Sequence, residues 1–249
     1  MTDASTATRL NANPARFSKD GYCVFPSVLS ASEIVDSRRV LEKLMADNPT
    51  QRPEHLTEPH VKNPALLELC RHPKIIAAVK AVLGENLALI MSHLIVKPAR
   101  EGKKVSWHQD RPTWESVKGT DIVTVWLAID DADSGNGCMK VIPNSQEGFP
   151  EMEIVYYKGD DVFNLKVDVS PELEKLAVPV ELAAGDLSIH DSYILHGSDA
   201  NLSDRRRAGY TMRYANAQTV RVDVEKHFAP VYLVSGEAGA GIAKYIDIR

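Results

Sequence analysis

The spacing of hydrophobic and polar positions changes along the chain and divides it into two parts. Up to Gly84 the apolar residues recur at helical spacing, which predicts a mainly helical front third. Beyond Gly84 they occur in short runs with alternating character, separated by turn signals such as residues 134–137. The chain is therefore predicted to be mainly β with flanking helices. We expect N-terminal helices followed by an antiparallel barrel or a jelly roll, the double-stranded β-helix.

Three helices are predicted in the front third, each with its own start signal. Ser30 and Glu33 form a capping box ahead of a run of apolar residues at helical spacing. Asn63 followed by Pro64 is an N-cap and N1 pair that begins a second, short helix. The third helix follows from Pro73.

The remaining segments complete the predicted domain. Residues 151–177 lack a clear period, and we expect a long insertion near the mouth of the barrel. Residues 1–13 are expected to be disordered, and without a linker or repeat we predict a single domain over residues 1–249. The predicted strands are residues 22–26, 87–96, 105–109, 122–129, 138–142, 178–182, 187–190, 193–196 and 207–215.

Two histidines and one aspartate have the spacing of a metal site. On a strand, His108 and Asp110 would point to the same face, and His196 would supply a third ligand. Two imidazoles and one carboxylate on one side of an octahedral ion leave its other side open, which suits non-haem Fe(II) working with O2. His190 competes for the third position. However, Arg207 stands eleven residues after His196, and no arginine stands at that distance from His190.

Arg207 is the candidate for binding an acidic cosubstrate. In an antiparallel return its guanidinium would lie near the open face of the metal and bind a dicarboxylate through a bidentate pair. Arg213 is the main rival, because an even step of six residues puts it on the same face of an unbroken strand. The spacing from His196 favours Arg207. Lys97, at the end of a predicted strand, is expected to keep its charge in water.

Several segments of the chain resemble the phytanoyl-CoA dioxygenase family. Residues 107–110 are similar to the family's WHQD segment. Residues 196–207 resemble its HGS-x-x-N-x-S segment, which precedes an arginine that binds 2-oxoglutarate. The resemblance runs from about Phe17 to about Ala215. It favours the jelly-roll alternative for the core.

The resemblance also implies the chemistry of the site. Fe(II) would be held by His108, Asp110 and His196, with 2-oxoglutarate and O2 as cosubstrates and ascorbate as a stimulant. Arg207 would bind the C5 carboxylate of 2-oxoglutarate. Further residues at family positions for the cosubstrate are Ser198, Trp126 and His93. Each of these three also has an ordinary structural interpretation, as a turn residue, a core aromatic and a strand histidine respectively.

The reaction implied is hydroxylation of a C–H bond in a small metabolite, with release of succinate and CO2. A natural-product intermediate is one candidate. Asp110 argues against halogenation, because halogenating relatives of this chemistry have a small residue there so that chloride can bind the iron. Desaturation, epimerisation and ring formation by the same iron chemistry remain alternatives, as does a jelly-roll binding module without turnover. Trp114 and residues 156–158 are candidates for the wall of the substrate pocket.

The amino-acid composition indicates which binding partners and which cellular compartment to expect. The 249 residues carry a net charge of −5, and a pI near 5.9 argues against nucleic acid as the main partner. Three cysteines without C-x-x-C spacing favour a reducing cytoplasm. No apolar run has the length of a membrane span, and the polar N-terminus lacks a signal-peptide core. We expect a cytoplasmic protein with a small-molecule substrate and neither a nucleic-acid nor a membrane partner.

Overall fold

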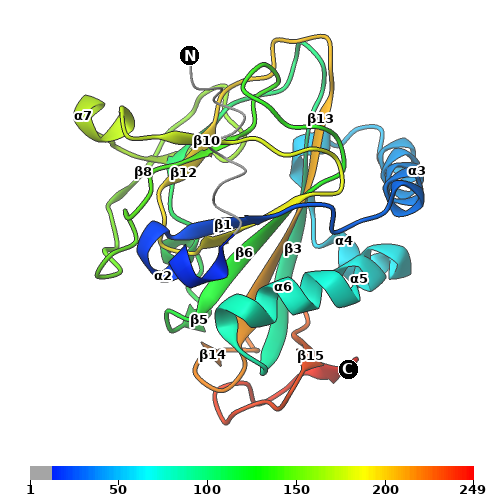
Figure 1. Cartoon of the computed structure of the whole chain (residues 1–249), viewed down its shortest axis with the longest axis vertical. Helices are drawn as coiled ribbons and strands as arrows, with labels where there is room; N and C mark the ends of the chain where they lie inside the picture. The colour runs from blue at the N-terminus through cyan, green and yellow to red at the C-terminus, as the bar shows by residue number, and fades with distance from the viewer. Residues whose placement is uncertain (1–12) are drawn as a thin grey trace.

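The computed structural model describes residues 13–249 (Figure 1). The disorder expected for residues 1–13 therefore falls outside the described residues, except at Asn13. The side chain of Asn13 accepts a hydrogen bond from the backbone of Ala15 and caps the short helix η1 (Pro14–Arg16).

Two β-sheets form the core of the molecule and face each other as a double-stranded β-helix. The eight-stranded sheet has the order β1-β11-β6-β13-β3-β15-β16, with β2 beside β3, and the four-stranded sheet has the order β10-β7-β12-β4. The sheets do not join into a closed barrel, so the jelly-roll alternative is confirmed. The large sheet contains β1 (Tyr22–Phe25), β2 (Leu56–Thr57), β3 (Leu87–Lys97), β6 (Ile122–Ala128), β11 (Leu187–Asp191), β13 (Arg207–Asn216), β15 (Tyr232–Ser235) and β16 (Ile246–Asp247). The small sheet contains β4 (Val105–His108), β7 (Met139–Val141), β10 (Val178–Val180) and β12 (His196–Ser198).

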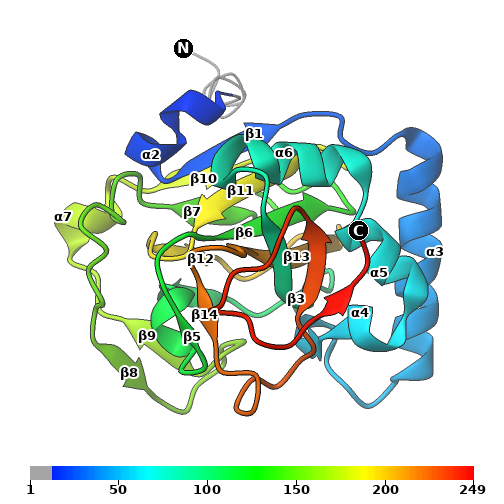
Figure 2. The same ribbon diagram turned by 90° about the horizontal axis from the view of Figure 1, so that it is seen from below.

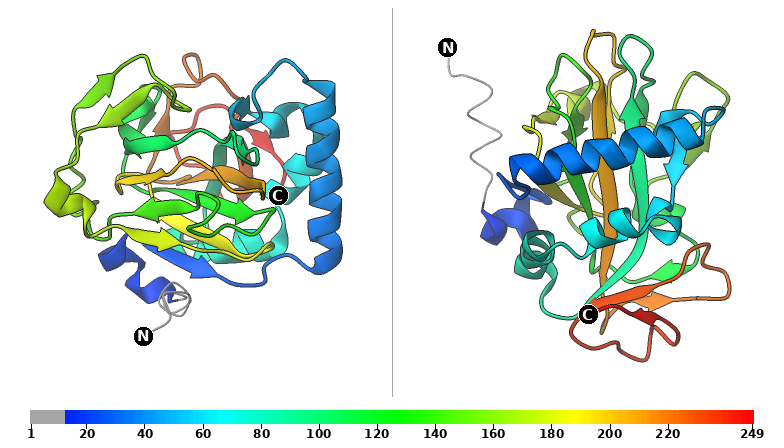
Figure 3. Two further views of the ribbon diagram at one scale, coloured as in Figure 1. Left: turned by 90° about the horizontal axis from the view of Figure 1, so that it is seen from above. Right: turned by 90° about the vertical axis from the view of Figure 1, so that its right-hand side faces the viewer.

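Helices from the front third cover the outer face of the large sheet (Figures 1 and 3). The helix α3 (Ala31–Asp47) begins at the predicted capping box, and Asn63 caps α5 (Pro64–Cys70) as predicted. The helix α6 (Pro73–Leu83) ends before Gly84. Their apolar side chains pack with those of the strands in one buried cluster. Fully burying one such side chain contributes roughly 1.5–3 kcal/mol. The remaining short helices are α2 (Phe17–Asp20), η2 (Pro53–His55), α4 (Pro59–Lys62), η3 (Arg111–Thr113) and α7 (Pro171–Glu174).

Side chains along each strand alternate between two faces of the large sheet. One face packs against the helices, and the other faces the space between the two sheets. On β6, Val123, Val125 and Leu127 point outward beneath the helices, so Thr124 and Trp126 point between the two sheets. On β13 the outward residues are Tyr210, Met212 and Tyr214, and the inward ones include Arg207, Thr211 and Arg213. The interior of the jelly roll is therefore lined by polar side chains from central strands.

Two strand predictions need correction. Residues 193–195 form no strand, and β12 begins at His196, because the chain turns after Asp191 to cross from the large sheet to the small one. The strand predicted for residues 105–109 ends at His108. No strand was predicted at the C-terminal strands β14 (Arg221–Val222), β15 and β16, nor at β2 and β5 (Val117–Lys118).

Residues 151–177 contain the hairpin of β8 (Ile154–Tyr156) and β9 (Leu165–Val167), followed by α7. Figure 2 shows them at the side of the molecule opposite α3. Within residues 13–249, no helix is both long enough and apolar enough to cross a membrane.

Candidate metal centre and the adjoining cavities

The two histidines of the predicted triad are direct partners across two strands. His196 on β12 lies opposite His108 on β4, and their ring centroids are 4.1 Å apart. With Asp110 they form a buried group whose ligand atoms all lie within 4.8 Å of one another. Antiparallel pairing in the small sheet thus joins residues that are far apart in the sequence.

Asp110 reaches this group from a turn and not from a strand, so the expected strand geometry is corrected. The chain leaves β4 after His108, and Asp110 adopts helical backbone angles (φ −70°, ψ −54°) as the N-cap of η3. The hydroxyl of Thr113 stabilises the turn by donating to the Asp110 carbonyl at 2.6 Å. Thr124 on β6 donates to Oδ2 of Asp110 at 2.6 Å, which holds the carboxylate toward the histidines.

Both histidines present a free Nε2 to the centre of the group. Nδ1 of His108 lies 2.9 Å from the carbonyl of Ser106, and Nδ1 of His196 lies 3.0 Å from that of Ile194. A carbonyl only accepts, so both Nδ1 atoms carry the proton and both Nε2 atoms keep a lone pair. Burial lowers the pKa of both imidazoles, which keeps them neutral. Such a donor set, with one carboxylate, fits a divalent transition metal.

Asp110 is ionised although it is buried. Burial alone would raise its pKa, but the positive charge of Arg213 and the neighbouring imidazole of His190 hold the pKa well below its usual value. Nη2 of Arg213 lies 3.7 Å from Oδ1 of Asp110, and Nε2 of His190 lies 3.8 Å from Oδ2. Neither ring nitrogen of His190 forms a hydrogen bond within residues 13–249. His190 lies beside the metal-ligand group and is not part of it.

A cavity of about 410 Å³ extends from the triad to Arg207, and Ser198 and Trp126 also line it. Nε of Arg207 donates to the carbonyl of Gly137 at 3.1 Å, and Nη1 donates to that of Ile95 at 3.2 Å. The guanidinium carbon lies 5.3 Å from the centroid of the Trp126 ring. The structure thus places three of the predicted cosubstrate residues in one cavity with the triad.

Lys97 is a second buried basic side chain, behind Ser198 at this end of the cavity, and the expectation that its charge lies in water was wrong. Its side chain is fully buried, and Nζ donates to Oγ of Ser198 at 2.7 Å and to the carbonyl of Asp199. Burial and the charge of Arg207 lower the pKa of Lys97 to about 6.

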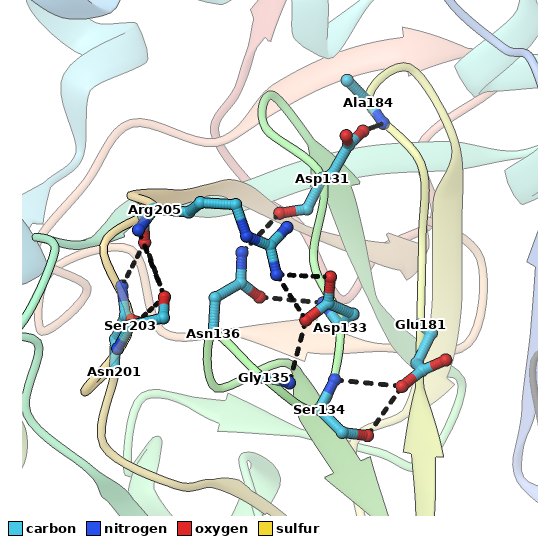
Figure 4. Close-up of polar contacts among 10 residues, drawn as sticks. All are labelled: Asp131, Asp133, Ser134, Gly135, Asn136, Glu181, Ala184, Asn201, Ser203 and Arg205. Atoms are coloured by element: carbon cyan, nitrogen blue, oxygen red, sulfur yellow. Dashed lines mark hydrogen bonds and ion pairs between the residues drawn. The ribbon is translucent and has the colours of Figure 1, made fainter.

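The loop between His196 and Arg207 is fixed by a network of side-chain hydrogen bonds (Figure 4). Nδ2 of Asn201 donates to the carbonyls of Pro98 at 3.0 Å and Arg205 at 2.7 Å. Arg205 binds both carboxylate oxygens of Asp133, in the neighbouring loop that leads to Gly137. This network holds in place both the backbone before Arg207 and the carbonyl that Arg207 contacts.

A second cavity, of about 570 Å³, meets the triad at His108 and Asp110. His93 lines this cavity and not the one that contains Arg207, and its Nε2 lies 2.9 Å from the carbonyl of Glu54. Trp114 lines it too. Of the other candidates for the substrate wall, Tyr156 is 74% exposed, and residues 156–158 line neither cavity.

Several residues that line these cavities were not predicted from the sequence, and Phe163 and Glu58 are two of them. Phe163 lies in the 151–177 segment and lines both cavities, with its ring edge-on to His108 at 5.5 Å. Glu58 lines the second cavity. Neither residue stands in a motif, so their positions depend on tertiary contacts alone.

A jelly roll that joins two histidines and a carboxylate to a cavity ending in a buried arginine defines a non-haem iron oxygenase. The family model for phytanoyl-CoA dioxygenase (PhyH) matches residues 17–209, and the chain belongs to this family. The predicted resemblance is confirmed. The protein is an oxidoreductase of the iron- and 2-oxoglutarate-dependent class.

Individual proteins resemble the chain in sequence or in fold. The chain is 25% identical to the peroxisomal phytanoyl-CoA dioxygenase of Bos taurus, over 84% of this chain and 69% of the relative. It is 26% identical to an ectoine dioxygenase of Bordetella parapertussis, over 86% of this chain and 76% of the relative. The solved structure of the epimerase SnoN with Fe3+, alpha ketoglutarate and nogalamycin RO matches with a TM-score of 0.70. It is 23% identical and covers 88% of this chain and 86% of its own.

Proposed function

We propose that this protein hydroxylates a C–H bond of a small metabolite and that His108, Asp110 and His196 hold its iron. The observation that carries the proposal is the shared cavity, which has a metal-ready donor set at one end and the buried Arg207 at the other, with Lys97 behind Ser198. A dicarboxylate that reaches from the metal to Arg207 would complement both ends.

Each residue around this cavity has a defined task. Arg207 would bind the C5 carboxylate of 2-oxoglutarate, with the hydroxyl of Ser198 beside it and Trp126 as a wall that excludes water. Lys97 orients Ser198 by donating to its hydroxyl. When bound, iron and 2-oxoglutarate supply O2 activation coupled to oxidative decarboxylation, with succinate and CO2 as products. The protein contributes placement of the reactants and exclusion of water.

The placement of Arg213 favours Arg207 for the C5 carboxylate. Both arginines point between the sheets, but the guanidinium of Arg213 lies next to Asp110 and therefore next to the metal. Arg207 lies on the strand six residues away, near Ser198 and Lys97. His93 faces the second cavity, so we assign it to the substrate side.

The same site would also serve desaturation, epimerisation or ring closure, each of which would form succinate with a product that contains no added oxygen. We further propose that the protein acts in the cytoplasm on a small molecule, without nucleic acid. The buried, unpaired thiols of Cys23, Cys70 and Cys138 and the acidic net charge support this.

The test is anaerobic reconstitution with Fe(II), with and without 2-oxoglutarate, followed by the weak visible charge-transfer band of the chelate. We expect a band in the wild type and none in His196→Ala, which serves as the control without a complete ligand set. A folded, iron-loaded wild type without a band would overturn the proposal and leave a metal-binding jelly roll that turns nothing over.

A further inference from the structure

The second cavity contains a cation whose donors are not all used. The side chain of Arg213 is 9% exposed, and its Nε has no hydrogen-bond partner within residues 13–249. Nη1 donates to the hydroxyl of Thr211 at 2.6 Å, while Nη2 lies 3.7 Å from Oδ1 of Asp110. Once Asp110 binds a metal, its charge is shared with that ion. Arg213 is then a buried cation without an anion of its own, which is costly unless a ligand supplies one.

The same cavity contains an acid that is held in a strained conformation. Glu58 has a positive φ of 49°, a backbone conformation that is rare and costly outside glycine and that clusters at functional sites. Its carboxylate accepts a hydrogen bond from the backbone of Ser92 at 3.2 Å and lies 3.6 Å from Nδ1 of His60. Burial raises the pKa of Glu58 to about 7, so it is substantially ionised at neutral pH.

The two opposite charges face one cavity but do not neutralise each other. No ion pair joins Glu58 to Arg213 in the part of the chain that the structure describes, although the charge of Arg213 lowers the pKa of Glu58. Apolar side chains of Met91, Trp114 and Phe163 make up other parts of the wall. The cavity therefore offers one anion, one cation and an apolar surface beside the metal ligands.

We propose that this cavity binds a small zwitterion of the amino-acid type, with its carboxylate on Arg213 and its ammonium group facing Glu58. The inference deepens the proposed function and rests on it, because the cavity meets the metal centre at His108 and Asp110. The apolar part of the ligand packs against Trp114 and against Phe163, whose ring lies edge-on to His108.

The charge of the cavity argues against a coenzyme A thioester as the substrate. Such a ligand carries several phosphate charges, and phosphates are usually bound by clusters of arginine and lysine. Arg213 is the one arginine or lysine among the described residues that line this cavity.

The experiment begins with the anaerobic Fe(II) and 2-oxoglutarate complex of the wild type. The twenty proteinogenic L-amino acids and ectoine are added one at a time, and the visible band and aerobic succinate release are recorded. We expect at least one probe to shift the band and to raise succinate release by roughly tenfold or more. The N-acetyl derivative and the methyl ester of that probe should each bind at least tenfold more weakly, since each removes one charge.

Two variants connect this response to the cavity. Glu58→Gln and Arg213→Lys should each raise the concentration of the probe needed for half-maximal response by at least tenfold. Glu58→Gln should leave the 2-oxoglutarate requirement unchanged and should reduce the penalty for N-acetylation. Arg39→Gln, on the exposed face of α3, is the matched control and should behave as the wild type.

Three results would overturn the inference. The first is a normal chelate band that no probe shifts, and the second is an equal response to a probe and to its N-acetyl and methyl-ester derivatives. The third is a full response in both variants. All three leave the proposed function intact, because the chelate still forms. Absence of the chelate in the wild type would instead remove the proposed function, and this inference with it.

Discussion

Lys97 and Arg207 are direct partners across β3 and β13, and both side chains are fully or almost fully buried. Neither forms an ion pair with an acid among residues 13–249. The pKa of each is lowered by burial, that of Arg207 to about 10, so their environment disfavours the positive charges. Two adjacent buried basic side chains without counter-ions are costly for folding. They are explained if the site binds an anion.

Arg207→Ala should raise the 2-oxoglutarate concentration needed to form the anaerobic Fe(II) chelate. Removing a buried arginine that faces a carboxylate costs about 2–5 kcal/mol, which corresponds to roughly 30-fold or more in affinity. Titration of the visible band measures the change, and the exposed Arg39→Ala is the control. If Arg213→Ala raised the requirement and Arg207→Ala did not, the C5 carboxylate would be reassigned to Arg213.

Lys97→Met should also weaken 2-oxoglutarate binding, but less than Arg207→Ala does. The substitution keeps the unbranched stem and removes the amine that donates to Oγ of Ser198 at 2.7 Å. Hydrogen bonds to charged groups are worth about 1.5–3 kcal/mol, so the requirement should rise roughly tenfold or more. Affinity for the metal alone, measured with Co(II), should not change. An unchanged 2-oxoglutarate requirement would mean that Lys97 only supports the loop at Ser198 and Asp199.

The sequence predicted those parts of the fold that depend on local signals. The capping box at Ser30, the N-cap at Asn63 and the long alternating run of β6 all correspond to observed elements. What could not be predicted depends on tertiary contacts. The turn of η3 that carries Asp110 requires contacts with Ser192 and Thr124, which lie far away in the sequence.

The site also contains both residues that local motifs predict and residues whose positions depend on tertiary contacts. The triad and Arg207 lie in motifs with recognisable spacing, and the structure brings all four to one cavity. Burial of Lys97 could not be inferred from its position at a strand end, because its acceptors belong to the loop after β12. His93 lies in the second cavity, since the twist and register of β3 decide which cavity each residue lines.

His196 and His190 should respond differently to substitution. His196→Ala removes a proposed ligand and should weaken Co(II) binding by more than 100-fold. Replacing a residue that only hydrogen-bonds to a metal ligand typically weakens metal binding by roughly 10–100-fold. His190→Phe should change it by tenfold at most. Because the ring nitrogens of His190 have no hydrogen-bond partner among the described residues, His190→Phe should leave the stability of the folded protein unchanged or raise it. Absorbance titration with Co(II) compares the two variants, and the reverse order of effects would make His190 the third ligand.

Gly209→Ala should disturb the wall of the 2-oxoglutarate cavity. A Cβ at this position would lie 2.1 Å from a carbon of the Trp126 ring, so the indole, which lies beside Arg207, would have to move. Overpacking of this kind costs about 1–3 kcal/mol of stability, measurable by chemical denaturation. Adding Trp126→Phe should make room and recover much of the loss. If the stability losses of Gly209→Ala and Trp126→Phe simply added in the double variant, the contact with Trp126 would not be what restricts residue 209.

Glu58→Gln should stabilise the metal-free protein at pH 8 and have little effect at pH 5. The pKa of Glu58 is raised from 4.5 to about 7 by burial, despite a backbone hydrogen bond from Ser92 and the charge of Arg213. The other titratable groups facing it are His60, Cys70 and Tyr232.

The sign of this effect follows from proton binding. The folded state holds the proton of Glu58 more tightly than the unfolded chain does, so its contribution to stability is full below pH 4.5 and is lost as the pH rises through about 7. The loss amounts to at most about 3 kcal/mol, and glutamine does not incur it. Urea denaturation of both proteins between pH 5 and 8 should show a stability difference that grows with pH. A stability difference that does not change with pH would mean that the pKa of Glu58 is the same in the folded and unfolded states. The folded protein would then not disfavour the Glu58 carboxylate, and a substrate ammonium group would have no unfavourable charge to neutralise.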